Sequence, residues 1–298
     1  MTTLTNLDDA KAAAARGALF VVSHSGGKDS QAQMIKVLEI VPASQVVVVH
    51  ADLAEVEWAG TREHAEAQAK AAGVPFVAAK AHTKAGDDLT FLGMAARRHA
   101  QRPEVPSWPS SSTRQCTSDL KRGPIAREVR AYAKANGYTE IVMVEGLRAA
   151  ESPKRAKLDA WTKDARNSTG GRTWWVWLPI HQMTTAEVFA TIKAAGQEPH
   201  WAYAVGNDRL SCTFCIMGSR GDAQRGAIYN PALFAAYVEM ERRTGYTAHM
   251  SRKSIEEVAG MTVAQAQAAN ADIKAGRRPG LPVIQDEPAR DIPPCMGR

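Results

Sequence analysis

The sequence predicts an α/β protein built on a doubly wound, mostly parallel five-stranded sheet, followed by a helical C-terminal extension. Short apolar runs alternate with amphipathic helical patterns over roughly the first two hundred residues. These runs are apolar throughout rather than at every second position, as expected of strands buried on both faces. Strands that alternate with helices form βαβ units, whose right-handed crossovers place helices on both sides of the sheet. Beyond about residue 200, only helical patterns follow.

The expected elements divide the chain into three parts. Residues 1–200 form the sheet domain, residues 201–276 hold a Cys-x-x-Cys segment and the helical extension, and residues 277–298 form an extended or mobile tail. The tail is assigned on its proline and charge content. Strands are expected at 18–23, 45–50, 74–79, 140–144 and 174–180, and helices at 30–40, 61–72, 125–136, 184–195, 231–244 and 254–275.

Composition narrows the class of protein. Of the 298 residues, 45% are hydrophobic and 23% are charged, which is typical of a globular chain. No apolar run approaches the ~20 residues of a membrane span, the opening segment lacks the pattern of a secretory signal, and four cysteines are too few for a disulfide framework. We therefore expect a cytoplasmic protein without a membrane partner. The net charge of +6 fits an anionic ligand and permits a nucleic-acid partner without requiring one.

The strongest local signal is a glycine-rich turn between the first expected strand and the first expected helix. Its glycine pair allows a tight turn and a close approach of the backbone to a ligand. The helix that follows presents its N-terminus, which favours anions, and a lysine adds a point charge. The pattern is neither a Walker A loop nor Gly-x-Gly-x-x-Gly. The segment reads Ser23-His24-Ser25-Gly26-Gly27-Lys28-Asp29-Ser30.

This turn resembles the pyrophosphate loop of the PP-loop (N-type ATP pyrophosphatase) superfamily, and the chain is most similar to its phosphoadenosine phosphosulfate (PAPS) reductase-like branch. The resemblance spans roughly residues 18–220. It implies a Rossmann-like fold of the adenine nucleotide alpha hydrolase-like type. The other matching segments are His50-Ala51-Asp52, residues 114–121, residues 145–152 with Arg155 behind them, and residues 209–215.

The resemblance also implies a nucleotide site. Lys28, Asp29 and Arg148 are the expected catalytic residues, with Arg148 just past the fourth strand, at the sheet edge where α/β proteins bind ligands. Arg155 is a further candidate to neutralise phosphate or sulfate, although an exposed helix face explains it and Lys121 equally well. The expected nucleotide-binding set is Ser23, Ser25, Gly26, Gly27, Lys28, Asp29, Ser30, Asp52, Gly146, Arg148 and Arg155.

The lysine of the loop favours ATP as the nucleotide, because a triphosphate offers charge beyond the α-phosphate. Members of the superfamily that cleave ATP resemble this Gly-Gly-Lys-Asp form more closely than do those that reduce PAPS or adenylyl sulfate. We therefore expect an enzyme that binds ATP with Mg²⁺ and cleaves it at the α-phosphate, with pyrophosphate release, in sulfur-transfer chemistry. A sulfur donor protein, and DNA or tRNA as acceptor, are the partners considered. The alternatives are a PAPS or adenylyl sulfate reductase and a non-catalytic nucleotide- or DNA-binding subunit. Acceptor and oligomeric state stay open.

The sequence is compatible with three hypotheses for the role of the cysteines. Cys212 and Cys215 form the Cys-x-x-Cys pair, Cys116 lies upstream and Cys295 lies near the C-terminus. PAPS reductase-like proteins carry cysteines placed like the first three, and several relatives bind a [4Fe–4S] cluster there. Zinc or a redox dithiol is the second hypothesis, and inert buried thiols are the third. Cys295 is the doubtful fourth ligand. The reductases' nucleophilic cysteine has glutamate and histidine neighbours that Pro293-Pro294-Cys295-Met296 lacks.

Overall fold

A computed structural model describes residues 4–277 and 279. The chain forms two compact units, each assembled from three segments. Unit 1 comprises Met1–Asp52, Gly60–Ala79 and Arg122–His200, and unit 2 comprises Leu53–Ala59, Lys80–Lys121 and Trp201–Arg298. The last segment of unit 1 ends at His200, and the last segment of unit 2 begins at Trp201. The division into residues 1–200, 201–276 and 277–298 stays a prediction. The structure additionally groups two earlier segments, 53–59 and 80–121, with the C-terminal part.

Unit 1 contains a six-stranded sheet of order β3-β2-β1-β4-β6-β5. The five expected strands are present and pair in parallel, which confirms the doubly wound, mostly parallel architecture. The additional strand β5 has three residues, too short for a periodic signal, and pairs antiparallel with β6. The strands are β1 Leu19–Ser23, β2 Val46–Ala51, β3 Phe76–Ala79, β4 Glu140–Val144, β5 Trp161–Lys163 and β6 Thr173–Trp177.

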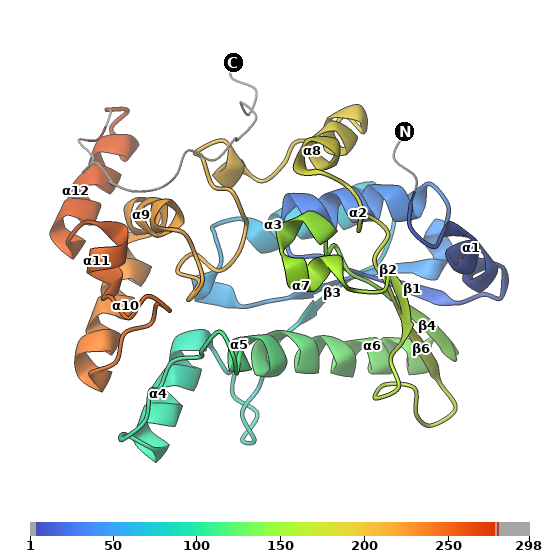
Figure 1. The fold of residues 1–298 in the computed structure, drawn as a ribbon, viewed down its shortest axis with the longest axis horizontal. Helices are drawn as coiled ribbons and strands as arrows, with labels where there is room; N and C mark the ends of the chain where they lie inside the picture. The colour runs from blue at the N-terminus through green and yellow to red at the C-terminus, as the bar shows by residue number, and fades with distance from the viewer. Residues whose placement is uncertain (1–3, 278, 280–298) are drawn as a thin grey trace. The chain divides into compact units, whose positions relative to one another are not determined.

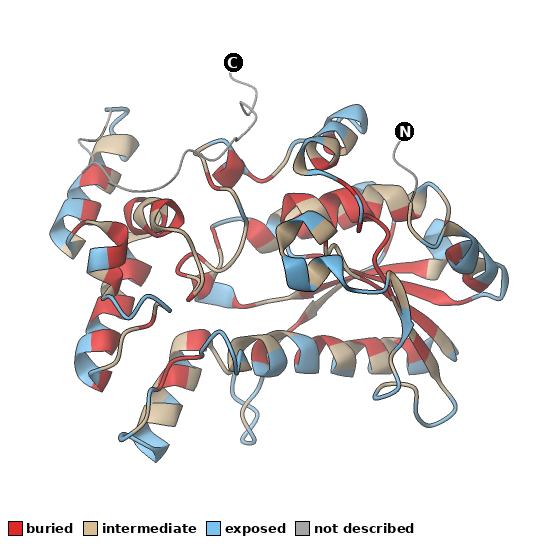
Figure 2. Cartoon of the chain, in the orientation of Figure 1, coloured by how far each residue is buried: buried red, intermediate tan, exposed pale blue. Residues whose placement is uncertain are grey.

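Both faces of this sheet are covered, as the all-apolar strands predict. Phe20 and Val22 of β1 belong to the core beneath α1 and α2, whereas Leu19 and Val21 belong to the core shared with α6. Helices α2 and α6 accordingly lie on opposite sides of the strands (Figure 1), and β1, β2 and β4 are buried along almost their whole length (Figure 2). The helices of unit 1 are α1 Leu7–Ala15, α2 Lys28–Leu38, α3 Thr61–Ala71, α6 Gly123–Ala135, α7 Pro153–Ala156 and α8 Thr185–Ala194.

The topology brings two distant loops together. Strand β1 lies between β2 and β4, and Val22 is in register with Val144 at the carboxyl ends of β1 and β4. The chain leaves β1 toward β2 on one side and later returns through β4 on the other, so this is the point where the strand order reverses. Open α/β sheets bind ligands at such a switch point. The loops that follow β1 and β4 therefore lie where a ligand is expected to bind.

Unit 2 is helical, and its core is rich in aromatic side chains. Phe91 and Trp108 each stack on Tyr237 and lie tilted against one another, and Phe214 packs against both Phe234 and Tyr237. Its helices are α4 Phe91–Gln101, α5 Gln115–Thr117, α9 Arg220–Tyr229, α10 Pro231–Thr244, α11 Ile255–Ala259 and α12 Val263–Lys274, and a π-helical turn spans Ser118–Arg122.

The expectation of one continuous helix over residues 254–275 is wrong. Gly260 adopts a left-handed conformation with φ of +68° and ends α11, and Thr262 then caps α12 by accepting a hydrogen bond from the Gln265 N–H. A left-handed glycine followed by a threonine cap is a stop signal and a start signal only two residues apart. In the described part of the chain, no helix combines the length and the apolar character that crossing a bilayer requires.

A buried carboxylate ties α10 to the chain that follows it. Glu241 is 8% exposed, and its two oxygens accept hydrogen bonds from the Ala248 N–H at 2.7 Å and the Ile255 N–H at 2.9 Å. Burial raises the pKa of this carboxyl, while the two N–H groups act in the opposite direction. The carboxylate thus satisfies two backbone donors that would otherwise be buried without partners.

We expect Glu241→Gln to lower the free energy of unfolding by about 2 kcal/mol, because the amide nitrogen would face one of those donors and leave it unpaired. Urea unfolding followed by circular dichroism measures the change. Glu239→Gln on the exposed side of the same helix is the matched control and should alter stability by less than about 0.5 kcal/mol. Equal effects of the two substitutions would contradict this account of Glu241.

Candidate nucleotide site

The loop after β1 turns directly into helix α2. Gly26 has a φ of +73°, a conformation open chiefly to glycine, and Gly27 is the extended residue that caps α2. Lys28, Asp29 and Ser30 form the first helical turn. Backbone N–H groups at a helix N-terminus carry partial positive charge and bind anions well. The glycine pair therefore sits where the sequence analysis expected it and gives the chain the geometry of an anion-binding turn.

Ser30 holds the loop together from within. Its hydroxyl donates to the Gly27 carbonyl at 2.8 Å and accepts from the Ser25 N–H at 3.2 Å. The Ser25 hydroxyl lies 3.4 Å from the same oxygen. The sequence analysis placed both Ser25 and Ser30 in the expected nucleotide-binding set. In the structure the Ser30 hydroxyl closes the turn.

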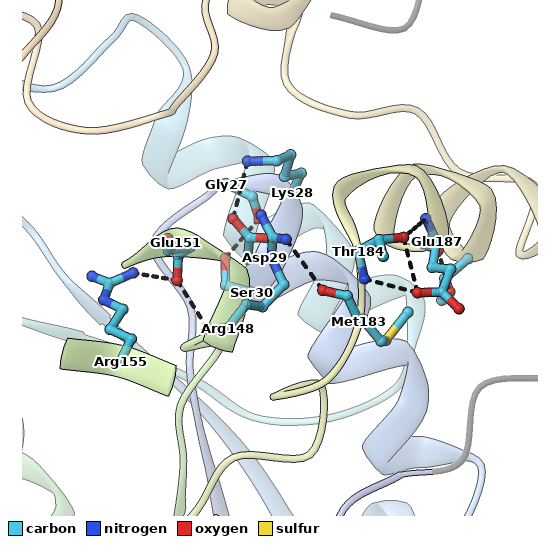
Figure 3. A network of polar contacts seen from close by, with 11 residues as sticks. Gly27, Lys28, Asp29, Ser30, Arg148, Glu151, Arg155, Met183, Thr184 and Glu187 are labelled. Atoms are coloured by element: carbon cyan, nitrogen blue, oxygen red, sulfur yellow. Dashed lines mark hydrogen bonds and ion pairs between the residues drawn. The ribbon is translucent and has the colours of Figure 1, made fainter. Parts of the chain in front are cut away.

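One carboxylate lies between two buried cations (Figure 3). Asp29 Oδ2 is 3.1 Å from Lys28 Nζ, and Asp29 Oδ1 accepts a 2.6 Å hydrogen bond from Arg148 Nε. The Lys28 and Arg148 residues are each 4% exposed. A single negative charge facing two positive ones leaves these three side chains with a net charge of about +1 next to a helix N-terminus, which favours an anionic ligand.

Arg148 is fixed by the loop after β4. Its Nη1 donates to the Met183 carbonyl at 3.2 Å, and its backbone N–H donates to Glu151 Oε2 at 2.9 Å. Glu151 also forms an ion pair with Arg155, whose side chain is 28% exposed (Figure 3). Two nitrogens of the Arg148 guanidinium are thus used inside unit 1, so the structure presents Arg148 as a fixed charge.

Gly146 lies where the two loops touch. A Cβ atom built on it would lie 3.1 Å from both the carbonyl carbon and the carbonyl oxygen of Asp29, and 3.3 Å from Gln33 Oε1. These distances are shorter than ordinary van der Waals contacts. The absence of a side chain at position 146 therefore allows the loop after β4 to approach the first turn of α2.

The remaining expected residues of unit 1 line the same sheet edge. Ser23 ends β1, and its carbonyl accepts a 2.7 Å hydrogen bond from Gln33 Nε2. Asp52 follows β2, the neighbour of β1, and its side chain is 7% exposed and paired with Arg62 at 2.9 Å. The structure thus places the eleven expected nucleotide-binding residues at the carboxyl ends of β1, β2 and β4: Ser23 is the last residue of β1, and the others lie in the loops and helical turns that follow these strands.

Sequence reasoning missed the polar side chains behind the loop. His24 is 1% exposed and accepts a 3.1 Å hydrogen bond from the Gly26 N–H through Nδ1. Its Nε2 lies 2.8 Å from Gln68 Oε1. His24 was visible in the motif, but a sequence does not tell which way a side chain points, and Gln68 lies 44 positions away.

The cysteines belong to unit 2. Cys116 lies on α5, and the Cys215 N–H donates to the Cys212 carbonyl in a tight turn. All three are free thiols of intermediate exposure. Burial raises the pKa of Cys212 to about 11 and raises that of Cys116 as well. Lys121 lies among them, and negative charge at Cys212 raises the lysine pKa more than burial lowers it.

No three His, Cys, Asp or Glu side chains within 4–277 and 279 are grouped so that they could hold a metal ion. The expected ligands Cys116, Cys212 and Cys215 have a lysine as their neighbour instead. Cys295, the doubtful fourth ligand, lies outside the described residues.

Comparison with solved structures gives distant likenesses. The PAPS reductase of Candida auris in a phosphate complex has a TM-score of 0.43 and 13% identity, over 71% of this chain and 96% of that one. An FMN adenylyltransferase of Candida glabrata, in complex with FAD and inorganic pyrophosphate, has a TM-score of 0.43 and 12% identity, over 72% of this chain and 64% of that one.

Comparison with protein sequences is more specific. An uncharacterised 37.8 kDa protein of Escherichia phage 186 is 33% identical over 135 residues, which is 45% of this chain and 39% of the phage protein. Residues 19–217 match the family described as the phosphoadenosine phosphosulfate reductase domain. This match begins at β1 and ends just after Cys215, so it includes the loops and thiols described above. The chain belongs to the phosphoadenosine phosphosulfate reductase domain family of the PP-loop superfamily.

Proposed function

We propose that the chain binds ATP with Mg²⁺ on the loop after β1 and cleaves it at the α-phosphate, as the activating step of a sulfur-transfer reaction. The observation that carries this proposal is the pair of buried cations, Lys28 and Arg148, that share the Asp29 carboxylate at the N-terminus of α2. A triphosphate supplies the negative charge that this arrangement favours. Mg²⁺ would bridge phosphate oxygens of the substrate and neutralise part of their charge.

In the proposed reaction, an acceptor oxygen attacks the α-phosphorus, the bond to the β-phosphate oxygen breaks, and pyrophosphate leaves. The acceptor then carries AMP, which a sulfur nucleophile displaces. Lys28 and Arg148 act by position and charge: they hold the α-phosphate and stabilise the negative charge that develops on its oxygens. Asp29 acts by position, because its carboxylate orients both cations. Such preorganised electrostatic stabilisation is commonly the largest single contribution to catalysis.

The acceptor is expected to be a nucleic acid or a small molecule, and the net charge of +6 agrees with either. The family also contains reductases by its description, so reduction of PAPS is the second candidate function. Calorimetric titration with Mg·ATP and with PAPS, combined with a pyrophosphate assay in the presence of tRNA or DNA, separates the two. Tight PAPS binding without pyrophosphate release from ATP would favour the reductase, and nucleotide binding with no turnover would favour a non-catalytic subunit.

We expect Arg148→Lys to lower kcat/KM for pyrophosphate release by about 10²-fold or more, the usual cost of losing one preorganised charge donor. A lysine keeps the charge, but its single nitrogen cannot reproduce the planar fork that binds Asp29 and Met183 together. Arg16→Lys is the control, since Arg16 is an exposed residue paired with Glu140. Unchanged turnover in Arg148→Lys would contradict the role assigned to this guanidinium.

We expect Gly146→Ala to weaken Mg·ATP binding roughly tenfold, because overpacking costs about 1–3 kcal/mol and 1.4 kcal/mol corresponds to a factor of ten. The added methyl group would push the loop after β4 away from the Asp29 carbonyl and take Arg148 with it. Ala150→Ser adds one atom to an exposed position of the same loop and serves as the control. Calorimetry measures both affinities. An affinity for Mg·ATP equal to that of wild type in Gly146→Ala would show that nucleotide binding does not depend on the close contact between position 146 and the Asp29 carbonyl.

For the thiols of unit 2, we propose a role as sulfur carriers. A thiolate would attack the outer sulfur of a donor protein's persulfide, gain that sulfur as its own persulfide and release the donor thiolate. Lys121 favours thiolates by its charge. Burial raises the pKa of the Cys212 and Cys116 thiols and so disfavours their thiolates. We therefore assign Cys215 as the first thiol to react.

Cys215 should be alkylated by iodoacetamide before Cys116 and Cys212 at pH 7.5, and Lys121→Met should slow its alkylation about three- to tenfold, since the nearby cation stabilises the thiolate that reacts. Mass spectrometry of tryptic peptides over time follows each site. Lys134→Met on α6 is the control.

Anaerobic purification with iron, sulfide and zinc analysis tests the alternatives to the carrier role. Four irons and four sulfides per chain would indicate a [4Fe–4S] centre in place of sulfur carriers, and one tightly held zinc would indicate a zinc site.

A further inference from the structure

The side chain of His24 makes hydrogen-bond contacts with both the glycine loop and helix α3. It is the first residue after β1, and its backbone is held on both sides: its N–H donates to the Val49 carbonyl at 2.9 Å, and its carbonyl accepts from His50 Nδ1 at 2.8 Å. With the backbone fixed on β2 and the side chain 1% exposed, the imidazole has little freedom to reorient. Its two nitrogens therefore face fixed partners.

These partners determine which nitrogen carries the proton. Gly26 can only donate through its backbone N–H, so Nδ1 of His24 accepts and bears no proton. The proton is then on Nε2, which donates to Gln68 Oε1 at 2.8 Å. The amide of Gln68 in turn directs its Nε2 to His64 Nε2 at 2.6 Å. Each donor meets an acceptor along this row from α3 to the loop, so one tautomer of His24 satisfies its contacts with both Gly26 and Gln68. The Ser30 hydroxyl, which donates to the Gly27 carbonyl, lies 3.4 Å from the same Nδ1.

The contact with Gly26 has the spacing of an Asx turn. In such a turn a side-chain acceptor at one residue binds the backbone N–H two residues later and holds the chain in a bend. Here the imidazole provides that acceptor, and the bend contains the left-handed Gly26 that leads into the helix cap at Gly27. Because of this bend, the chain passes directly from Gly26 into the N-terminus of α2. Burial also lowers the pKa of His24 to about 3, which keeps Nδ1 an acceptor across the physiological range.

We propose that His24 is the positioning residue of the anion-binding turn: its neutral, Nε2-protonated imidazole, held in that tautomer by Gln68, fixes the Gly26 bend that presents α2 to the nucleotide. This inference rests on the proposed function for its ligand, but the bend and the tautomer exist without the ligand. His24 does not touch the substrate in this scheme. It acts through the backbone of Gly26.

The test compares two substitutions of His24. Asparagine places Oδ1 close to the position of Nδ1 and can still accept the Gly26 N–H, whereas leucine fills the space without an acceptor. We expect His24→Asn to bind Mg·ATP within about threefold of the wild-type affinity and His24→Leu to bind at least tenfold more weakly, by calorimetry. His82→Asn, at a partly exposed histidine of unit 2, is the control. Equal affinity of His24→Leu and wild type would overturn the proposal.

Two further measurements need no nucleotide. Nitrogen NMR of the His24 imidazole in the wild-type protein should show a proton on Nε2 and none on Nδ1 from pH 5 to pH 9. In hydrogen exchange, the Gly26 amide should exchange slowly in wild type and in His24→Asn but rapidly in His24→Leu. A proton on Nδ1, or a Gly26 amide that exchanges alike in all three, would also overturn the proposal. If wild type binds no nucleotide while these signals behave as expected, the proposed function fails and the role of His24 in the bend stands.

Discussion

The site depends on one carboxylate. Asp29 faces Lys28 and Arg148 at once, and both cations are almost completely buried. Burying an unpaired charge is costly, by several kcal/mol even after relaxation, and the shared Asp29 carboxylate lowers this cost for both cations. The same arrangement leaves an excess of positive charge at the helix N-terminus. The carboxylate thereby makes a cationic site compatible with a folded protein.

The topology of the sheet brings Arg148 to Asp29. Asp29 and Arg148 are 119 positions apart in the chain, yet β1 and β4 are hydrogen-bonded neighbours, so the loops at their carboxyl ends meet. Gly146 allows the contact to be close. The side chain of Arg148 is then oriented by Met183, which precedes α8. Three segments of unit 1 therefore fix the orientation of the Arg148 guanidinium: the first turn of α2, the loop after β4 and the chain just before α8.

Much of this could be predicted from the sequence, because the relevant signals are local. Apolar runs mark the strands of unit 1, and a glycine pair followed by lysine and aspartate marks the turn. The signals that failed are short or distant. Strand β5 has three residues and no period, and Gly260 interrupts a helical pattern that otherwise continues. Unit 2 unites residues 53–59 and 80–121 with the C-terminal part through packing contacts that no local pattern encodes.

The polar groups of the loop show why residue type alone does not assign a role. Ser30 and His24 both carry groups that could face a ligand, but Ser30 bonds to Gly27 and His24 to Gly26. A loop that bends sharply leaves backbone donors and acceptors without regular partners, and buried ones must be satisfied. In this loop the side chains of Ser30 and His24 satisfy such groups and thereby fix the shape of the turn. In the function proposed above, Lys28, with its charge at the helix N-terminus, is the residue of the turn best suited to contact the phosphates, and His24 and Ser30 hold the turn that presents it.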